Sequence, residues 1–125
     1  MTRRRGDGGQ AAVELALVLP FVCLTLLALV QIGLVVHTQL VVTHAAREGV
    51  RAAAVDPHPS AAHVAIVSST TLDPLRTEVD VSPRGDERVR VEVTYSMPTD
   101  VPLVGALIGD VDLSAAAVMR VEHDG

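Results

Sequence analysis

The chain has 125 residues and a formal net charge of −5, with ten arginines, no lysine and a single cysteine, Cys23. The acidic balance argues against a nucleic-acid partner, because phosphate binding requires a basic surface. The lone cysteine excludes an intrachain disulfide, and the length allows one small domain besides a membrane helix.

Residues 1–9 form a short leader that contains Arg3, Arg4 and Arg5. Positive charge beside a membrane helix favours the cytoplasmic side, so we expect a cytoplasmic N-terminus and an extracytoplasmic C-terminal part. The expected location is the inner (cytoplasmic) membrane, with lipid as a partner. Loss of residues 1–9, with three Arg and one Asp, would leave seven Arg against fourteen acidic residues and a net charge of −7.

A transmembrane helix is predicted over residues 10–36. No side chain from Leu15 to Val36 carries a formal charge, and these 22 residues would form a helix of about 33 Å, against a hydrocarbon core of about 30 Å. The run is too long for an ordinary secretory signal, and no convincing small-residue cleavage site closes it. Pro20 predicts a kink, since it removes one backbone donor.

Glu14 stands at the head of this apolar run, five residues after Gly9. A carboxylate at the edge of a membrane helix costs free energy unless something pairs with it, so it marks a candidate functional site. Glycine leaves no side chain to obstruct a peptidase, and we expect Gly8-Gly9 to be a flexible pair that is prone to extended conformation. The sequence therefore predicts a cut between Gly9 and Gln10 that retains the helix.

Such a cut would make Glu14 the fifth residue of the processed chain. In a bundle of subunits, the new ammonium group of one chain could pair with Glu14 of its neighbour, which removes an unpaired charge from a low-dielectric setting. The alternative is a plain signal anchor, in which Glu14 is tolerated near the cytoplasmic interface.

Two motifs flank most of the apolar run: G-Q-A-A-V-E-L-A-L-V-L-P at residues 9–20 and A-A-R-E-G-V-R at residues 45–51. They resemble the TadE-like family, pilin-like minor subunits of the tight-adherence (Flp pilus) system, whose usual signature is G-x-x-A-V-E-F-A-L-V-x-P followed by A-A-R-E-G-A-R. The resemblance covers about residues 6–54. Leu15 stands where phenylalanine is common and Val50 where alanine is common. The cysteine pair of some relatives is absent.

The resemblance implies a structural protein without a cofactor, cut after Gly9 by a prepilin peptidase. Glu14 would align its helix with other pilin-like subunits on an inner-membrane assembly platform. It also implies a possible subunit-contact motif, made of Ala45, Ala46, Arg47, Glu48, Gly49 and Arg51. The alternative for this motif is a solvated helix face, on which Glu48 and Arg51 form a surface pair worth about 0.2–0.5 kcal/mol.

The helix is predicted to continue beyond the membrane as an extracytoplasmic amphipathic helix over residues 37–56. Small and apolar side chains recur there at helical spacing, at Val42, Ala45, Ala46, Gly49 and Ala52. Pro57 and Pro59 end the helix, because each proline disfavours helical conformation before it. A helix from Ala11 to Val55 would reach on the order of 65 Å. His37 and His44 share a face, but two histidines without a third ligand do not predict a metal site.

Residues 60–125 are predicted to form a small extracytoplasmic α+β domain. Ser60 is the expected N-cap of a short helix through Val67. Alternating apolar and polar residues then predict strands over 78–81, 88–95 and 111–122, with a turn over 83–86. The inward side chains would be Val89, Val91, Val93 and Tyr95 in the second strand and Leu113, Ala115, Ala117 and Met119 in the third.

A three-stranded antiparallel sheet needs a cover, and the second half of the long helix is the natural one. The fold class is therefore α+β, with a pilin-like arrangement. The apolar segment Leu103–Ile108 is either a loop folded onto the core, which we favour, or an exposed contact.

No catalytic pattern emerges, since the chain has no G-x-S-x-G motif and no Gly-rich phosphate loop. We predict a non-enzyme: a TadE-like minor pilin or pseudopilin in the assembly of Flp-type pili. The alternative is an unprocessed, signal-anchored membrane protein whose extracytoplasmic domain binds a ligand or partner.

Overall fold

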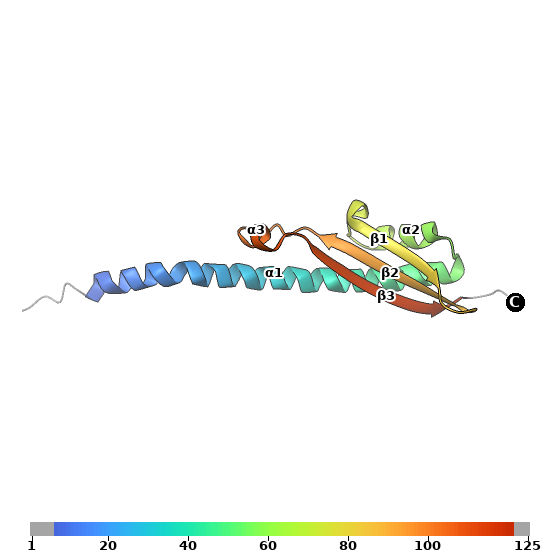
Figure 1. Cartoon of the computed structure of the whole chain (residues 1–125), viewed down its shortest axis with the longest axis horizontal. Coiled ribbons are helices and arrows are strands. Elements are labelled where there is room, and N and C mark those ends of the chain that lie inside the picture. The colour runs from blue at the N-terminus through green and yellow to red at the C-terminus, as the bar shows by residue number, and fades with distance from the viewer. Residues whose placement is uncertain (1–6, 122–125) are drawn as a thin grey trace, which may run out of the picture.

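The computed structural model describes residues 7–121 and shows one long helix with a small domain along its C-terminal half (Figure 1). The elements in chain order are α1 (Asp7–Val55), α2 (Pro59–Ser69), the 3-10 helix η1 (Pro74–Arg76), β1 (Thr77–Pro83), β2 (Arg88–Met97), α3 (Val104–Ile108) and β3 (Val111–Arg120). The predicted α+β architecture, with a long helix packed on a three-stranded antiparallel sheet, is confirmed. Arg3–Arg5 and the predicted strand end at Glu122 lie outside the described residues.

Helix α1 contains 49 residues, which corresponds to about 74 Å. It ends at Val55, the last residue of the expected continuous helix and one residue short of the range 37–56, directly before the Asp56-Pro57 pair. It begins earlier than expected, so Gly8 and Gly9 are helical and the prediction of an extended pair is wrong. Glycine tolerates helical dihedrals, and the good helix formers that follow extend the hydrogen-bond ladder back to it.

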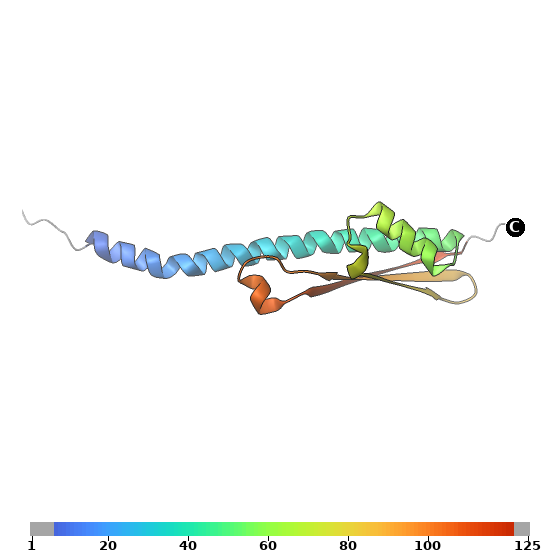
Figure 2. The ribbon, with the colours of Figure 1, turned by 90° about the horizontal axis from the view of Figure 1, so that it is seen from above.

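The N-terminal part of α1, in blue, changes direction in Figure 2. Pro20 is the proline inside this helix. Its ring lacks an N–H and clashes with the carbonyl group of the preceding turn, which accounts for the bend.

The sheet has the order β1-β2-β3, so β2 is the central strand. Its valines Val89, Val91 and Val93 are buried and alternate with half-buried Arg90 and Glu92. The predicted inward face is therefore correct, and Tyr95 packs against the same core from a half-buried position. Val91 pairs with Val81 of β1 and Ala117 of β3, which sets the register of the three strands.

Helix α2 lies along the C-terminal part of α1 and also contacts β1 (Figures 1 and 2). Its buried residues are Ala62 and Ile66. The helix begins at Pro59 with His58 as the N-cap, so the prediction of Ser60 as the cap is wrong. Proline suits the first helical position, because its φ is already helical and its missing N–H has no partner there.

Two predictions near the C-terminus also need correction. Leu103–Ile108 is not a loop folded onto the core: it contains α3, where Val104 is buried but Leu107 and Ile108 are exposed. In β3, Leu113 is buried and Ala115 and Ala117 are half-buried, whereas Met119 is exposed. Met119 is exposed although its pairing partner Val89 is buried, and Val121, two residues further on, still packs against the core.

Candidate functional site

The N-terminal half of α1 has almost no contact with the rest of the chain. Every residue from Gly8 to Val30 is exposed, except half-buried Leu27. Large apolar side chains dominate this surface, and Leu17 and Phe21 are 66% and 71% exposed. Within the described residues, α1 is the one helix long and apolar enough to cross a membrane. Such a surface requires lipid or other helices around it.

Gly9, Gln10 and Glu14 lie together at the start of this surface. All three are exposed, and the Gln10 Nε2 amide donates a hydrogen bond of 3.2 Å to Glu14 Oε1. The two side chains share a face because they are four residues apart on a helix. Glu14 carries the sole formal charge of residues 8–46, so no charged side chain lies in the helix turns that follow it.

The contact motif at residues 45–51 divides into a buried part and an exposed part. Ala45 and Ala46 are 0% and 1% exposed. A Cβ added at Gly49 would lie 2.8 Å from Ile66 Cδ1 and 3.1 Å from Val91 Cγ1. These small residues therefore let α2 and β2 approach α1 within the same chain.

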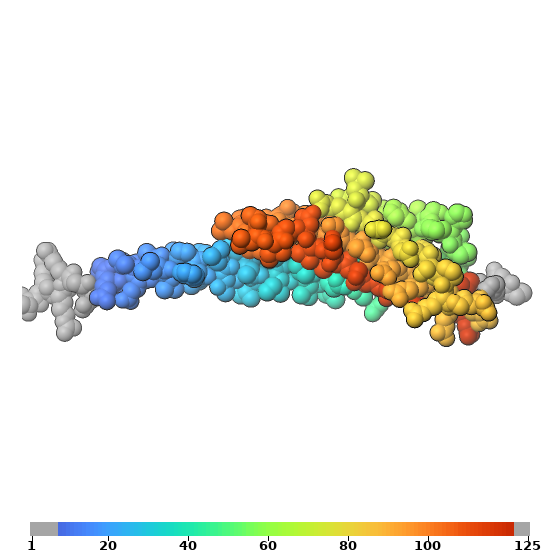
Figure 3. Space-filling view, viewed as in Figure 1, coloured from blue at the N-terminus to red at the C-terminus, as the bar shows by residue number. Residues whose placement is uncertain are grey.

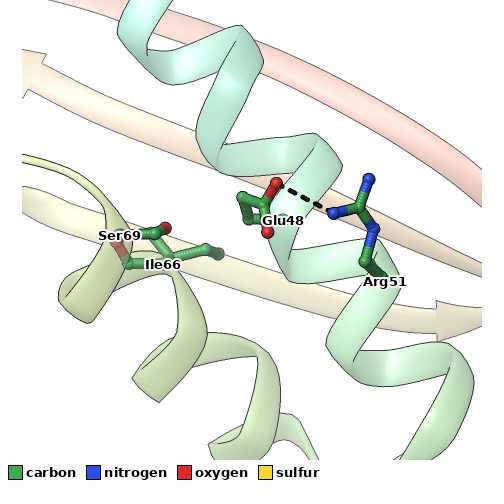
Figure 4. A network of polar contacts seen from close by, with 4 residues as sticks. All are labelled: Glu48, Arg51, Ile66 and Ser69. Atoms are coloured by element: carbon green, nitrogen blue, oxygen red, sulfur yellow. Dashed lines mark hydrogen bonds and ion pairs between the residues drawn. The ribbon is translucent and has the colours of Figure 1, made fainter.

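The charged residues of the motif lie outside the buried core, and Figure 4 shows the ion pair between Glu48 and Arg51. Arg51 donates to Glu48 across 3.4 Å, and their side chains are 68% and 28% exposed. The nearby Ser69 hydroxyl donates to the Ile66 carbonyl oxygen at 3.4 Å, within α2. Only the face with Arg47, Glu48 and Arg51 is open to a neighbouring subunit, and its role there stays a prediction.

His37 and His44 both line a shallow hollow beside α1 that Thr70 and Thr71 close from the other side. His37 also lines an adjacent hollow of about 280 Å³, together with Tyr95 and Asp100. In the part of the chain that the structure describes, no three His, Cys, Asp or Glu side chains form a group suited to a metal ion.

Gln31 is the residue that sequence reasoning missed. Its side chain is 5% exposed, and neither its amide nitrogen nor its oxygen has a hydrogen-bond partner among residues 7–121. The sequence shows a polar residue in the apolar run, but nothing in it indicates burial. That burial marks the point along α1 where the folded domain begins to cover the helix.

The family comparison matches the helix that carries these residues. A family model described as TadE-like protein matches residues 9–51. This segment is similar to TadE-like proteins. The match begins at Gly9, includes Glu14 and ends at Arg51, so the predicted resemblance is confirmed for both motifs. Neither curated proteins nor solved structures give a match. The TadE-like segment and the long apolar helix fit a pilus-related protein with a single membrane anchor.

Proposed function

We propose that this protein is a TadE-like minor pilin or pseudopilin, a structural component in the assembly of tight-adherence (Flp-type) pili. The observation that carries the proposal is the similarity of residues 9–51 to TadE-like proteins, together with a helix surface that the rest of the chain leaves uncovered over the first part of that segment, as far as Val30. A helix with such a surface is suited to a bundle of similar helices within a membrane. The role is structural and involves no catalysis or cofactor.

A prepilin peptidase is the expected processing partner, with the cut after Gly9. The scissile segment is helical in the unprocessed chain, so the first turn must open before an extended peptide can enter a peptidase. This opening is easy, because helix ends fray and glycine is about 0.8–1.0 kcal/mol less favourable than alanine in a helix. The glycine pair would therefore make the peptide bond after Gly9 accessible to the peptidase at the membrane surface.

Glu14 is the expected alignment point between subunits. Its carboxylate already accepts a hydrogen bond from Gln10, the residue that would carry the new ammonium group. A neighbouring chain offset along the bundle would present its own ammonium group at the same depth. Pairing there would neutralise an isolated carboxylate in a low-dielectric setting, whereas a misaligned neighbour would leave it unpaired.

The proposed location is the inner membrane, with residues 1–9 in the cytoplasm and the α+β domain outside. The proposed partners are other pilin-like subunits, the assembly platform and lipid. The alternative, an unprocessed signal-anchored binding protein, has the same topology and differs in its intact N-terminus.

The test is the N-terminal mass of the membrane-extracted protein, measured with and without a co-expressed prepilin peptidase. A Cβ added at Gly8 or Gly9 meets no atom within 4 Å, so neither Gly9→Ala nor Gly8→Ala disturbs the packing. Gly8→Ala is thus a matched control for the same helix turn. We expect a peptidase-dependent start at Gln10 in the original chain and in Gly8→Ala, and no cut in Gly9→Ala.

An intact leader in the original chain in the presence of an active peptidase would overturn the processing proposal. It would then favour the signal-anchored alternative. A second measurement, cross-linking of Glu14→Gln in cells that assemble pili, tests alignment: we expect loss of cross-links to other pilin-like subunits while processing continues.

A further inference from the structure

Helix α3 lies at the end of the domain that is nearest the exposed half of α1. It belongs to the connection between β2 and β3, and it contacts α1. Figures 1 and 2 place it at the same position along the long helix from two directions. In the space-filling view, this orange-red tip extends furthest along α1 toward its blue N-terminal end (Figure 3).

The tip presents large apolar side chains outward. Leu103, Leu107 and Ile108 are 62%, 84% and 59% exposed, whereas Val101 and Val104 are buried beneath them. No side chain from Val101 to Gly109 is polar, and the segment is bounded by Asp100 and Asp110. An exposed apolar cluster with a polar border marks an interaction surface.

The tip is held in a defined conformation. Gly105 packs so closely on the Thr99 carbonyl group that no Cβ would fit, and the Thr99 hydroxyl donates to the Gly109 carbonyl oxygen. Arg76 pairs with Asp110 across 3.2 Å at the base of the tip. Leu103 has a φ of +66°, and among residues 7–121 it is the one non-glycine residue with a positive φ. A positive φ is unfavourable for leucine, so the backbone at Leu103 is strained in the conformation that leaves its side chain exposed.

The depth of the tip follows from the coverage of α1. Gln31 is the first buried residue of the helix, so residues 11–30 are the part of the apolar run that is uncovered on nearly every face. These 20 residues measure about 30 Å. A span that continued to residue 36 would place the backbone of the β2–β3 connection within hydrocarbon, where unpaired polar groups are costly. The contacts between the domain and α1 therefore favour a membrane span shorter than the predicted residues 10–36. In that arrangement the tip lies at the membrane surface.

We propose that the α3 tip (Val101–Gly109) inserts Leu103, Leu107 and Ile108 into the headgroup–acyl boundary of the membrane that α1 crosses. The inference rests on the membrane anchoring of the proposed function. The tip continues the uncovered apolar surface of α1 and carries no charge of its own, so its fitting partner is lipid. Because Asp100 and Asp110 border it and no arginine lies within it, insertion requires no anionic lipid.

The experiment measures the surroundings of single cysteines in the full chain, in a Cys23→Ser background. The three variants Leu107→Cys, Leu75→Cys and Leu17→Cys carry an environment-sensitive fluorophore, in phosphatidylcholine vesicles at low protein density. Leu75 is the matched control, since it is a 95% exposed leucine outside the tip. Leu17 reports on the membrane span itself. Nitroxide-labelled lipid quenches probes in the membrane, and iodide quenches probes in water.

We expect lipid nitroxides to quench the probes at positions 107 and 17 several-fold more strongly than the probe at position 75. Iodide should quench the probe at position 75 more strongly than the other two. Adding anionic lipid should leave the result at position 107 unchanged. A probe at 107 that behaves like the one at 75, while position 17 is in lipid, would overturn the tip insertion and leave the anchoring intact. A probe at 17 in water would overturn the proposed anchoring.

A further outcome identifies a different partner. If the probe at 107 is shielded from iodide without quenching by lipid nitroxides, and becomes accessible as the protein is diluted in the membrane, the tip contacts a second copy of the chain. That result also overturns the lipid proposal.

Discussion

Single residues along α1 show where the membrane half ends and the folded half begins. Two glutamines lie eight positions apart on this helix in opposite situations. Gln31 is buried without a hydrogen-bond partner in the described part of the chain, whereas Gln39 donates to the Ser114 carbonyl oxygen at 3.0 Å. The same type of side chain therefore destabilises the fold at position 31, where its amide is buried without a partner among the described residues. At position 39 it stabilises the fold through a hydrogen bond to β3.

Replacement of these glutamines by leucine should have effects of opposite sign. Gln31→Leu removes a buried amide with no partner and should raise the free energy of unfolding by about 1–2 kcal/mol, while Gln39→Leu should lower it by about 0.5–1.5 kcal/mol. Thermal unfolding of the full chain in detergent micelles measures both. A Gln31→Leu variant less stable than the original chain would show that the amide has a partner in solution.

The residue scale also shows what sequence can and cannot predict. The valines of β2 were predictable, because alternation with Arg90 and Glu92 indicates one buried face. The burial of Gln31 was not, because it depends on contacts from residues far away in the sequence. Likewise Gly8 and Gly9 favour disorder locally, but the helix that follows them includes them in its first turns.

At the scale of elements, Gly49 sets how closely α1 packs on its two neighbours. Both α2 and β2 meet α1 at this position, through Ile66 and Val91. The sequence showed that small and apolar residues recur at helical spacing on this face of α1. It did not indicate that α2 shares this face with the sheet, because α2 has no charged residue and little periodic pattern to show which side it buries.

Gly49→Ala should lower the free energy of unfolding by about 1–2 kcal/mol, since the overpacking exceeds the gain of about 0.8–1.0 kcal/mol in helix propensity. Gly33→Ala is the matched control in the same helix, because its Cβ would meet no atom within 4 Å. We expect that variant to gain about 0.5–1 kcal/mol. Equal stability of the two variants in thermal unfolding would mean that α1 moves away from α2 without cost.

At the scale of the whole molecule, the chain consists of an anchor and a domain that share one helix. The domain draws its core from Val42 onward in α1 together with α2 and the sheet. The short helix α3 could not be predicted, because its apolar residues resemble a core segment in sequence.

Removal of the anchor should leave the domain folded. A fragment of residues 27–125 keeps every buried residue of α1, so we expect cooperative thermal unfolding with a midpoint within about 4 °C of the full chain. A fragment of residues 43–125 is the control. It lacks Val42 and the Gln39–Ser114 hydrogen bond, and it should lose several kcal/mol or fail to fold. Equal midpoints for the two fragments would contradict this division.

The side-by-side placement of domain and helix limits the reach of one subunit. Residues 31–55 of α1 rise by about 38 Å, and α2 and the sheet lie along this stretch instead of on top of it (Figure 1). A lone copy could therefore touch only molecules within roughly this height of the membrane surface. Contact with a distant surface would require many copies stacked one above another, so solitary and polymerised forms would meet entirely different sets of partners.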